Sequence, residues 1–420
     1  MRIFFWLCLL LLIPGLLLRI PSEGAGILAT DILVPLYAVI WILKKLFIDR
    51  SFPKSSFVVP GIMFGIFAIL SFFMGAHNLL LKEQILSAAY IVRFASLIVF
   101  GWAAADMYLD SFEQTPRKFF TRIFGISFVV LILGILQFYL IPDISRWSTE
   151  GGWDPHTGRL LGTWMDPNFI AGFIGFLLPM GIAHWYQTHA RNKKFWILLF
   201  LALSVGALFL TFSRSGYLAA VAGLFVFFLL RNPKVIFIGI ALATLGILSN
   251  DRAQKRVGEL VGTISAIVLR DTDEIDPTAS LRIQNWRKSI TLWKKYPVFG
   301  IGYNTYRYRA AEEGIVDETY FSAGGSDSTH LTVLVTTGIL GMLAYLWFWG
   351  DLLIRNWQRF RRTRNEYFLG FFAGITALFV HACFVNSLLF PLIFLPLIAI
   401  AGILDVFSSQ QSGKKLFSFL

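Results

Sequence analysis

Long apolar runs recur along nearly the whole chain and are the main clue to its architecture. Stretches of about 20 mostly apolar residues follow one another, and a helix of about that length crosses the roughly 30 Å hydrocarbon core of a bilayer. The runs do not alternate polar and apolar positions, as the strands of a membrane β-barrel would. The pattern therefore predicts an all-α polytopic membrane protein.

About twelve membrane spans are predicted in this way. They lie near residues 3–18, 27–43, 56–75, 85–108, 119–141, 168–187, 195–212, 215–230, 234–249, 330–354, 367–386 and 388–407. The first could also be a signal peptide because Arg2 precedes an apolar run, but no small-x-small cleavage site follows Leu18, so an uncleaved helix is expected. The last two are separated only by a tight turn around 386–391 and could form one re-entrant pair.

The spans divide the chain into three parts. Residues 1–249 contain spans one to nine, residues 250–329 form a large extracytoplasmic loop, and residues 330–420 contain spans ten to twelve and a cytoplasmic tail. No internal repeat is found in the sequence, which argues against the transporters that are built from inverted repeats.

The composition and the charge distribution support this topology. The chain is 56% hydrophobic and only 15% charged, with a mean hydropathy of +0.66. Its net charge of +12 could indicate nucleic-acid binding, but the basic residues gather in alternate loops. These loops carry Lys44, Lys45, Arg50, Lys54, Arg117, Lys118, Arg122, Arg191, Lys193, Lys194, Arg231, Lys234 and a run of arginines from 355 to 364. The positive-inside rule therefore places them and both termini in the cytoplasm.

Motifs for metals, nucleotides and disulfides are missing from the sequence. Cys8 and Cys383 fall inside predicted spans, where apolar packing is their expected role. There is no Walker loop, dinucleotide glycine pattern or His-Glu-x-x-His motif, and Asp271-Thr-Asp273 belongs to an acidic turn. No cofactor or metal is therefore expected, and a reaction on the outer face would need a substrate that arrives already activated.

Two amphipathic helices are expected within the large loop. Apolar residues recur at helical spacing over 252–270, and an acidic turn follows. A second helix begins after Ser280, and one face of it carries Ile283, Trp286, Ile290 and Trp293. Such a face suits a helix that lies at the membrane interface. Residues 296–303 are rich in turn formers, and Ser326-Asp-Ser-Thr-His330 is typical of an N-cap that leads into span ten.

Three arginines are candidates for binding an anion on the outer face. Arg214 lies in Thr211-Phe-Ser-Arg-Ser-Gly216, where a guanidinium and two hydroxyls can meet an anion. The alternative is an interfacial arginine that reaches the lipid headgroups. Arg282 and Arg287 lie on the second amphipathic helix of the loop, where a solvated face is the alternative for either residue.

Further candidates lie at the start of span ten and inside the spans. His330 falls in the first turn of span ten, where the helix dipole favours the neutral imidazole that a general base requires; a packed or capping histidine is the alternative. Arg93 lies within span four, and there it would pair with a carboxylate, hold a lipid phosphate or tie helices together. Other ionisable residues in or near spans are Asp31, Asp106, His184, His381 and Asp405.

In their order along the chain, these motifs resemble the O-antigen ligase family, part of the ligase and polymerase superfamily that acts on undecaprenyl-linked glycans. The turn at 211–216 matches the Ser-Arg-x-Gly element of that family. Arg159-Leu-Leu-Gly-Thr163 and Asp166-Pro-Asn168 match its Arg-x-x-Gly and Pro-Asn element. The resemblance covers the full chain, including the twelve spans and the loop between spans nine and ten.

The large loop carries the remaining matches to the family. Arg282 with Trp286, followed by residues 297–302, matches the middle of the loop, and His330 with Gly338-Ile-Leu-Gly341 matches the segment that closes it. Family members often have Asn after the histidine and Glu before Gly-x-x-Gly. This chain departs from that pattern at two positions, which are Leu331 and Thr337.

The resemblance implies a metal-independent membrane glycosyltransferase. Such ligases transfer a glycan from undecaprenyl diphosphate to a sugar hydroxyl of lipid A core, on the periplasmic face of the bacterial inner membrane. Arg214 and Arg282 would bind the diphosphate and offset charge on the leaving group, and His330 would deprotonate the acceptor hydroxyl for an inverting attack. The residues expected to bind the diphosphate or the glycan are Arg214, Arg282, Arg159, Asn168, Arg93 and Arg287.

Other functions stay open on this evidence. An O-antigen or exopolysaccharide polymerase uses the same donor but extends another lipid-linked chain, and a protein O-oligosaccharyltransferase is a third enzyme. A transporter or flippase for lipid-linked sugars belongs to a different class, and it should have broken helices at mid-membrane. Because the candidate residues gather on one face, we expect an enzyme whose partners are a lipid-linked glycan, lipid A core or another glycan acceptor, and membrane lipids, with no role for nucleic acid.

Overall fold

A computed structural model provides the structure of the 420-residue protein. It describes residues 1–20, 26–109, 116–145, 156–251, 254–255, 257–259, 277–315, 324–411 and 417–419. Most of the predicted helix over 252–270, and the acidic turn that contains Asp271 and Asp273, lie outside the described residues.

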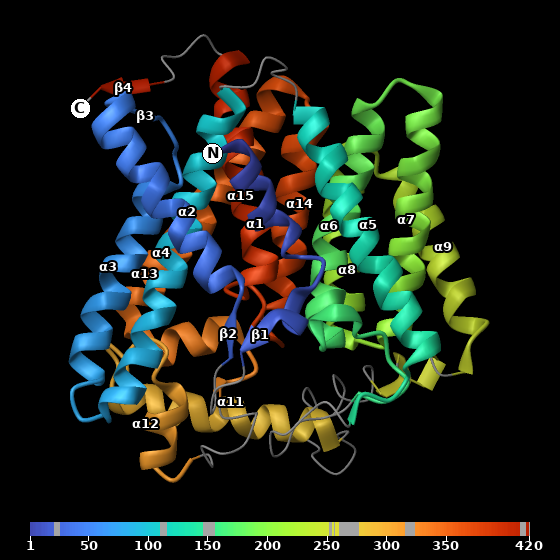
Figure 1. The fold of residues 1–420 in the computed structure, drawn as a ribbon. Helices are drawn as coiled ribbons and strands as arrows, with labels where there is room; N and C mark the ends of the chain where they lie inside the picture. Colours follow the sequence, from blue (N-terminus) through green and yellow to red (C-terminus); the bar gives the residue numbers. More distant parts are fainter. Residues whose placement is uncertain are drawn as a thin grey trace.

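Helices make up nearly all of the regular structure (Figure 1). They are α1 (Arg2–Leu10), α2 (Thr30–Lys44), α3 (Val58–Gly75), α4 (Leu81–Leu109), α5 (Pro116–Leu140), α6 (Pro167–Gln187), α7 (Arg191–Thr211), α8 (Arg214–Arg231), α9 (Lys234–Leu248), α11 (Pro277–Lys295), α12 (Tyr306–Glu312), α13 (Thr329–Thr363), α14 (Glu366–His381) and α15 (Pro391–Gln411). Two short antiparallel pairs join β1 (Arg19–Ile20) to β2 (Ile27–Leu28) and β3 (Ser51–Pro53) to β4 (Phe417–Phe419).

The predicted all-α membrane architecture is confirmed. Each of the predicted spans overlaps a helix, although α1 covers only the first half of the span predicted over 3–18. Eight of the described helices are long and apolar enough to cross a membrane: α3, α4, α5, α6, α7, α8, α13 and α15. The others, α1, α2, α9 and α14, have 9, 15, 15 and 16 residues, so the count of twelve spans stays a prediction. The last two predicted spans form separate helices, α14 and α15, joined by a loop over 382–390.

Close backbone contacts between helices hold the core of the bundle together. Helix α15 packs along α4, where a Cβ added at Gly402 would lie 2.0 Å from the carbonyl oxygen of Gly101. Small residues at such crossings let two helices approach closely, as in other membrane bundles. The outer surface is apolar instead, with exposed side chains such as Phe73 and Trp196, which are 70% and 63% exposed. This distribution is the one expected of a bundle surrounded by lipid.

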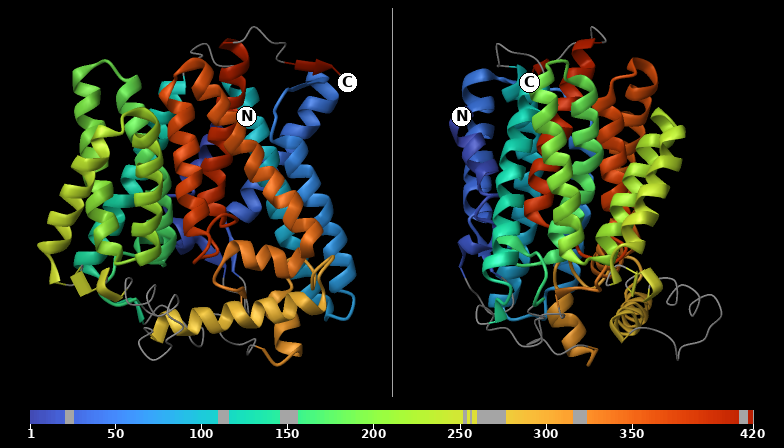
Figure 2. Two further views of the ribbon diagram at one scale, coloured as in Figure 1. Left: turned by 180° about the vertical axis from the view of Figure 1, so that it is seen from behind. Right: turned by 90° about the vertical axis from the view of Figure 1, so that its right-hand side faces the viewer.

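Helices α11 and α12 lie beneath one end of the bundle, here called the loop end, and α11 runs across the membrane helices (Figure 2). Ser289 and Leu292 are fully buried on its inner face, whereas Ile290 is 38% exposed. The other residues of the predicted apolar face are partly buried, and the position of this face at a membrane interface stays a prediction. A hydroxyl contact of 2.7 Å between Ser289 and Tyr306 joins α11 to α12, and burial raises the pKa of Tyr306.

A break in α13 fixes the position of the large loop. Gly338 has φ 64° and ψ −168° inside this 35-residue helix, so the carbonyls just before it turn away from the helical ladder. Backbone N–H groups from the preceding loop reach them, since Ile301 N donates to Val335 O at 3.0 Å and Gly302 N to Thr336 O at 3.1 Å. In return, Ile339 N donates to the loop carbonyl of Pro297 at 2.9 Å. The turn-rich segment predicted over 296–303 is thus a backbone extension docked on α13.

Replacing Gly338 should undo this docking. The φ and ψ of Gly338 are accessible only to glycine, which makes alanine there unfavourable by about 1–3 kcal/mol, and its Cβ would lie 2.2 Å from Val298 O. We expect Gly338→Ala to lower the apparent melting temperature of the detergent-solubilised protein. The matched control is Gly350→Ala on the same helix, where an added Cβ meets nothing within 4 Å; equal melting temperatures for the two variants would contradict the proposed role of the break.

Candidate active site

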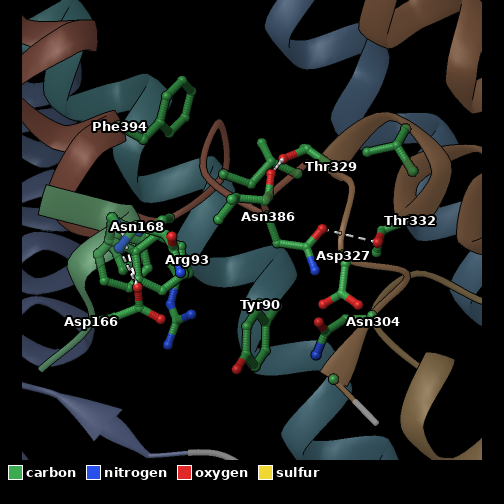
Figure 3. Close-up of a pocket in the computed structure, with 18 of the residues that line it drawn as sticks. Tyr90, Arg93, Asp166, Asn168, Asn304, Asp327, Thr329, Thr332, Asn386 and Phe394 are labelled. Carbon is green, nitrogen blue, oxygen red and sulfur yellow. Dashed lines mark hydrogen bonds between the residues drawn. The ribbon is translucent and has the colours of Figure 1, made fainter. Parts of the chain in front are cut away.

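A cavity of about 480 Å³, lined by both apolar and polar residues, lies near the loop end of the bundle (Figure 3). Its walls come from α4, α6, α13 and α15, and from the loops that precede α12 and α15. The polar side chains labelled around it include Tyr90, Arg93, Asn168, Asn304, Asp327 and Asn386. Segments that are far apart in the sequence therefore form one chamber.

Arginines dominate the charge of this cavity. Four of them line it, against two aspartates among the described lining residues; the arginines are Arg19, Arg93, Arg282 and Arg307, and the aspartates are Asp166 and Asp327. Even when Arg93 is counted as neutralised by its partner Asp31, three arginines face two aspartates. The remaining positive charge attracts an anion, because a low-dielectric wall strengthens the field of the cations.

Arg93 is held rigidly inside the helical bundle. Its Nε and one terminal nitrogen donate to the two carboxylate oxygens of Asp31 at 2.6 Å each, and its guanidinium lies 4.1 Å from the centre of the Tyr90 ring. Asp31 also accepts from the backbone N–H of Leu28 at 2.9 Å. Of the roles predicted for Arg93, the structure shows the pairing with a carboxylate, and it also places the residue in the cavity wall.

The Asp-Pro-Asn motif forms the start of α6 at the cavity. Asp166 caps the helix by accepting from the backbone N–H groups of Asn168 at 2.6 Å and Phe169 at 3.3 Å, and Pro167 occupies the first helical position. The side chain of Asn168 lines the cavity and accepts a 2.8 Å hydrogen bond from the Ser213 hydroxyl. The positive end of the α6 dipole therefore faces the chamber.

Arg159 acts as a brace outside the cavity lining. Its Nε donates to the carbonyl of Thr211 at 2.7 Å and a terminal nitrogen donates to that of Phe212 at 3.4 Å, which satisfies carbonyls at the end of α7. Phe212 there has a left-handed φ of 46°. Arg159 thus shapes the turn that carries Arg214.

Arg214 lies next to Ser213, which contacts a residue that lines the cavity. It is the first residue of α8, whose N-cap, Ser213, accepts from Gly216 N at 3.2 Å. Its guanidinium is 3.6 Å from the carboxylate of Glu259, and it is absent from the described lining of the cavity. The link to the chamber runs through Ser213 and its hydrogen bond to Asn168.

His330 occupies the first turn of α13, as predicted, behind the N-cap Ser328. Its Nε2 lies 3.0 Å from the carbonyl of Phe379 and its Nδ1 lies 3.0 Å from the hydroxyl of Tyr345. Since a carbonyl only accepts, Nε2 carries the proton and Nδ1 accepts from Tyr345. The ring is packed 4.5 Å from that of Phe379, and His330 is not among the described residues that line the cavity.

The loop helix contributes one predicted arginine to the cavity and keeps the other outside it. Arg282 lines the chamber, while Arg287 is exposed and is not part of the described lining. Between the arginine positions, Asn285 donates to the Asp327 carboxylate at 3.0 Å. The ring of Trp286 lies 6.0 Å from that of Phe384, in the loop before α15. Arg282, Arg93 and Asn168 are therefore the predicted residues that the structure brings together.

Sequence reasoning missed several residues of this cavity, and Asp327 is the most informative. It stands directly before the N-cap of α13 with a left-handed φ of 55°, a strained conformation for a residue other than glycine. Its carboxylate faces the chamber. The acidic residue in Ser326-Asp-Ser328 was visible in the sequence, but the motif is equally typical of a plain helix cap. Arg307 and Asn304 carried no comparable signal.

Among the described residues, no group of three or more His, Cys, Asp or Glu side chains is arranged to hold a metal ion. The chemistry that the cavity offers is that of guanidinium groups, amides, threonine hydroxyls and two carboxylates.

Helices of membrane length around a cationic chamber at one end define a polytopic membrane protein that is suited to an anionic substrate. Residues 198–346 match the family model described as O-antigen ligase. This match, which covers about a third of the chain, supports the resemblance to the O-antigen ligase family. The enzymes of that family are membrane glycosyltransferase-like proteins of the ligase or polymerase type that act on lipid-linked glycans. A search of curated proteins found no match.

The structural role of Arg159 can be separated from the binding role expected from the sequence. Hydrogen bonds from a charged group contribute about 1.5–3 kcal/mol, so Arg159→Ala should lower the apparent melting temperature clearly. Arg191→Ala, which removes an exposed arginine at the start of α7, should leave it unchanged. If Arg159→Ala melts like the Arg191 variant but binds the lipid-linked donor more weakly, Arg159 is a binding residue and the bracing role is wrong.

Proposed function

We propose that the protein is an O-antigen ligase. It transfers a glycan from undecaprenyl diphosphate to a sugar hydroxyl of lipid A core, in the bacterial inner membrane, with both termini in the cytoplasm and the cavity on the periplasmic face. The observation that carries this proposal is the convergence of four arginines on one chamber at the loop end, within a chain whose residues 198–346 match the O-antigen ligase family model. The matched segment, residues 198–346, contributes Arg282, Arg307 and Asp327 to that chamber.

The arginines serve as the clamp for the diphosphate. Arg282 and Arg307 come from the loop helices and Arg93 from the bundle, so they can approach an anion from two sides. Guanidinium groups match phosphate oxygens with paired donors. They stabilise the charge that grows on the leaving diphosphate as its bond to the anomeric carbon breaks. Arg214, whose turn contacts Asn168 through Ser213, lies in a position to support the same group.

Asp327 is the base that the cavity geometry favours. A general base must reach the hydroxyl that it deprotonates, and the Asp327 carboxylate faces the chamber. It would take the proton of the acceptor hydroxyl while that oxygen attacks the anomeric carbon, and the diphosphate leaves with the electron pair of the broken bond. One displacement of this kind inverts the anomeric configuration. His330, the base expected from the sequence, has both ring nitrogens in contacts with Phe379 and Tyr345 and stays a prediction for direct test.

A transfer assay tests the proposed reaction. The purified protein is incubated with undecaprenyl-diphosphate glycan and core lipid A, with and without a chelator, and the lipids are separated by mass. We expect a heavier lipid A conjugate under both conditions. A longer lipid-linked chain without any conjugate would identify a polymerase instead. Transport of the donor across proteoliposomes, with no new covalent product, would identify a flippase.

Removing the guanidinium of Arg282 should slow the transfer strongly. Loss of one preorganised donor to a developing anion lowers kcat by about 100- to 1,000-fold, and we expect a loss of that size for Arg282→Ala. Lys294→Ala removes one exposed cation from the same helix, α11, outside the described cavity lining, and serves as the control for net charge. Comparable rates for the two variants would rule out a specific role of Arg282.

The base is identified by comparing isosteric changes at two positions. Asp327→Asn keeps the size of the side chain and its contact with Asn285 but cannot accept the proton, so transfer should fall by about 100- to 10,000-fold with donor binding retained. His330→Gln should reduce the melting temperature more than the rate per folded molecule, because the ring packs on Phe379. The reverse result, with activity lost only in His330→Gln, would assign the base to His330.

A further inference from the structure

A second cavity, of about 590 Å³, lies at the end of the bundle opposite α11. It is formed where the segment before α3 meets the last turns of α13 and α15. Its cations are Lys54, Arg355, Arg359 and Arg362, and its hydroxyls include those of Ser55 and Ser56. None of these residues takes part in the cavity at the loop end.

One carboxylate organises this cavity from within. Asp405 accepts hydrogen bonds from the hydroxyls of Ser55 and Ser56 at 2.9 Å each, and it also accepts from the Ser56 backbone N–H and from Arg359. Its side chain is only 5% exposed. With both oxygens already engaged, Asp405 ties α13, α15 and the segment before α3 into one frame and has no capacity to neutralise further cations.

The frame leaves an excess of positive charge at the cavity. Arg355 pairs with Asp351 at 2.7 Å and Arg359 pairs with Asp405. Lys54 and Arg362 are exposed, and among the described residues no carboxylate lies within ion-pair distance of either one. Two cations that have no carboxylate partner among the described residues make this cavity suited to a phosphate group.

The surface next to these cations favours a lipid as the source of the phosphate. Helices α3 and α13 pack along each other, and their outer faces are apolar beside the cations. Val59 and Ile62 of α3 are 59% and 50% exposed, and Ile354 of α13 is 57% exposed. A phospholipid would contact the cations with its phosphate and the apolar helix faces with its acyl chains. A free phosphate would contact only the cations. Basic pockets of this kind at helix ends are suited to anionic lipid headgroups.

We propose that this second cavity binds the phosphate headgroup of an anionic phospholipid, with Lys54 and Arg362 as its principal contacts. The acyl chains then lie along the apolar faces of α3 and α13. In the orientation proposed above, the bound lipid belongs to the cytoplasmic leaflet. Binding holds the ends of α3, α13 and α15 together, and α13 is the helix whose other end frames the chamber at the loop end.

The test uses the full-length protein, native mass spectrometry and thermal unfolding in detergent. Dioleoyl phosphatidylglycerol should be retained and should raise the melting temperature, while dioleoyl phosphatidylcholine and millimolar inorganic phosphate should do neither. The variant is the double substitution Lys54→Gln with Arg362→Gln. We expect it to weaken phosphatidylglycerol binding by about tenfold or more, as fits the loss of two cations near an anionic headgroup.

The control removes the same charges elsewhere. Arg191→Gln with Lys193→Gln takes one arginine and one lysine from the start of α7, where both are exposed and outside the second cavity. It should bind phosphatidylglycerol like the wild type. Equal losses in the two double variants would show diffuse attraction to charge and overturn the site, and stabilisation by inorganic phosphate alone would overturn a lipid ligand. No glycan transfer is measured, so the outcome is independent of the proposed reaction.

Discussion

The backbone junction at Gly338 is the constraint on which the loop end depends. A helix of 35 residues breaks at one glycine, and the carbonyls released there accept hydrogen bonds from Ile301 and Gly302. Because this junction uses main-chain groups, it fixes the position of the loop along α13, and most side-chain substitutions would leave that position unchanged. Asn304 and Arg307 follow directly in the chain, and Asp327 and Thr332 stand on the other partner. The cavity exists because these two segments are locked together.

The helical architecture could be predicted from the sequence, whereas the contacts that build the site could not. Apolar runs of membrane length identify helices by themselves, since the bilayer imposes both length and polarity. Helical periodicity predicts which face of α11 is apolar, but it does not reveal that Ser289 is buried against Tyr306, because that partner comes from another helix. The break at Gly338 was equally hidden, as a single glycine in an apolar run gives no sign of a non-helical φ and ψ.

In the candidate site, too, individual residues could be predicted from local sequence motifs, whereas their contacts with segments far away in the sequence could not. Charge, the cost of an ionised group in the membrane, and a sequence motif point to Arg282, Arg93 and Asn168, and the structure places all three in the lining of one cavity. His330 was selected because its position in the first turn of a helix suits a neutral base. The partners that hold its ring, Phe379 and Tyr345, come from later helical segments. The sequence does not distinguish the role of Asp327, because a capping motif has the same residues whether or not its carboxylate faces a cavity.

The size of the chamber limits how much of a glycan substrate an enzyme of this kind can recognise. About 480 Å³ is room for a ligand of drug size, so of a long glycan only the units next to the diphosphate fit inside, while the rest extends into solvent. Under the proposed reaction, recognition is then confined to the linkage sugar. The enzyme would handle short and long polymers with similar rate constants, and the length distribution of the product would be inherited from the step that assembled the donor.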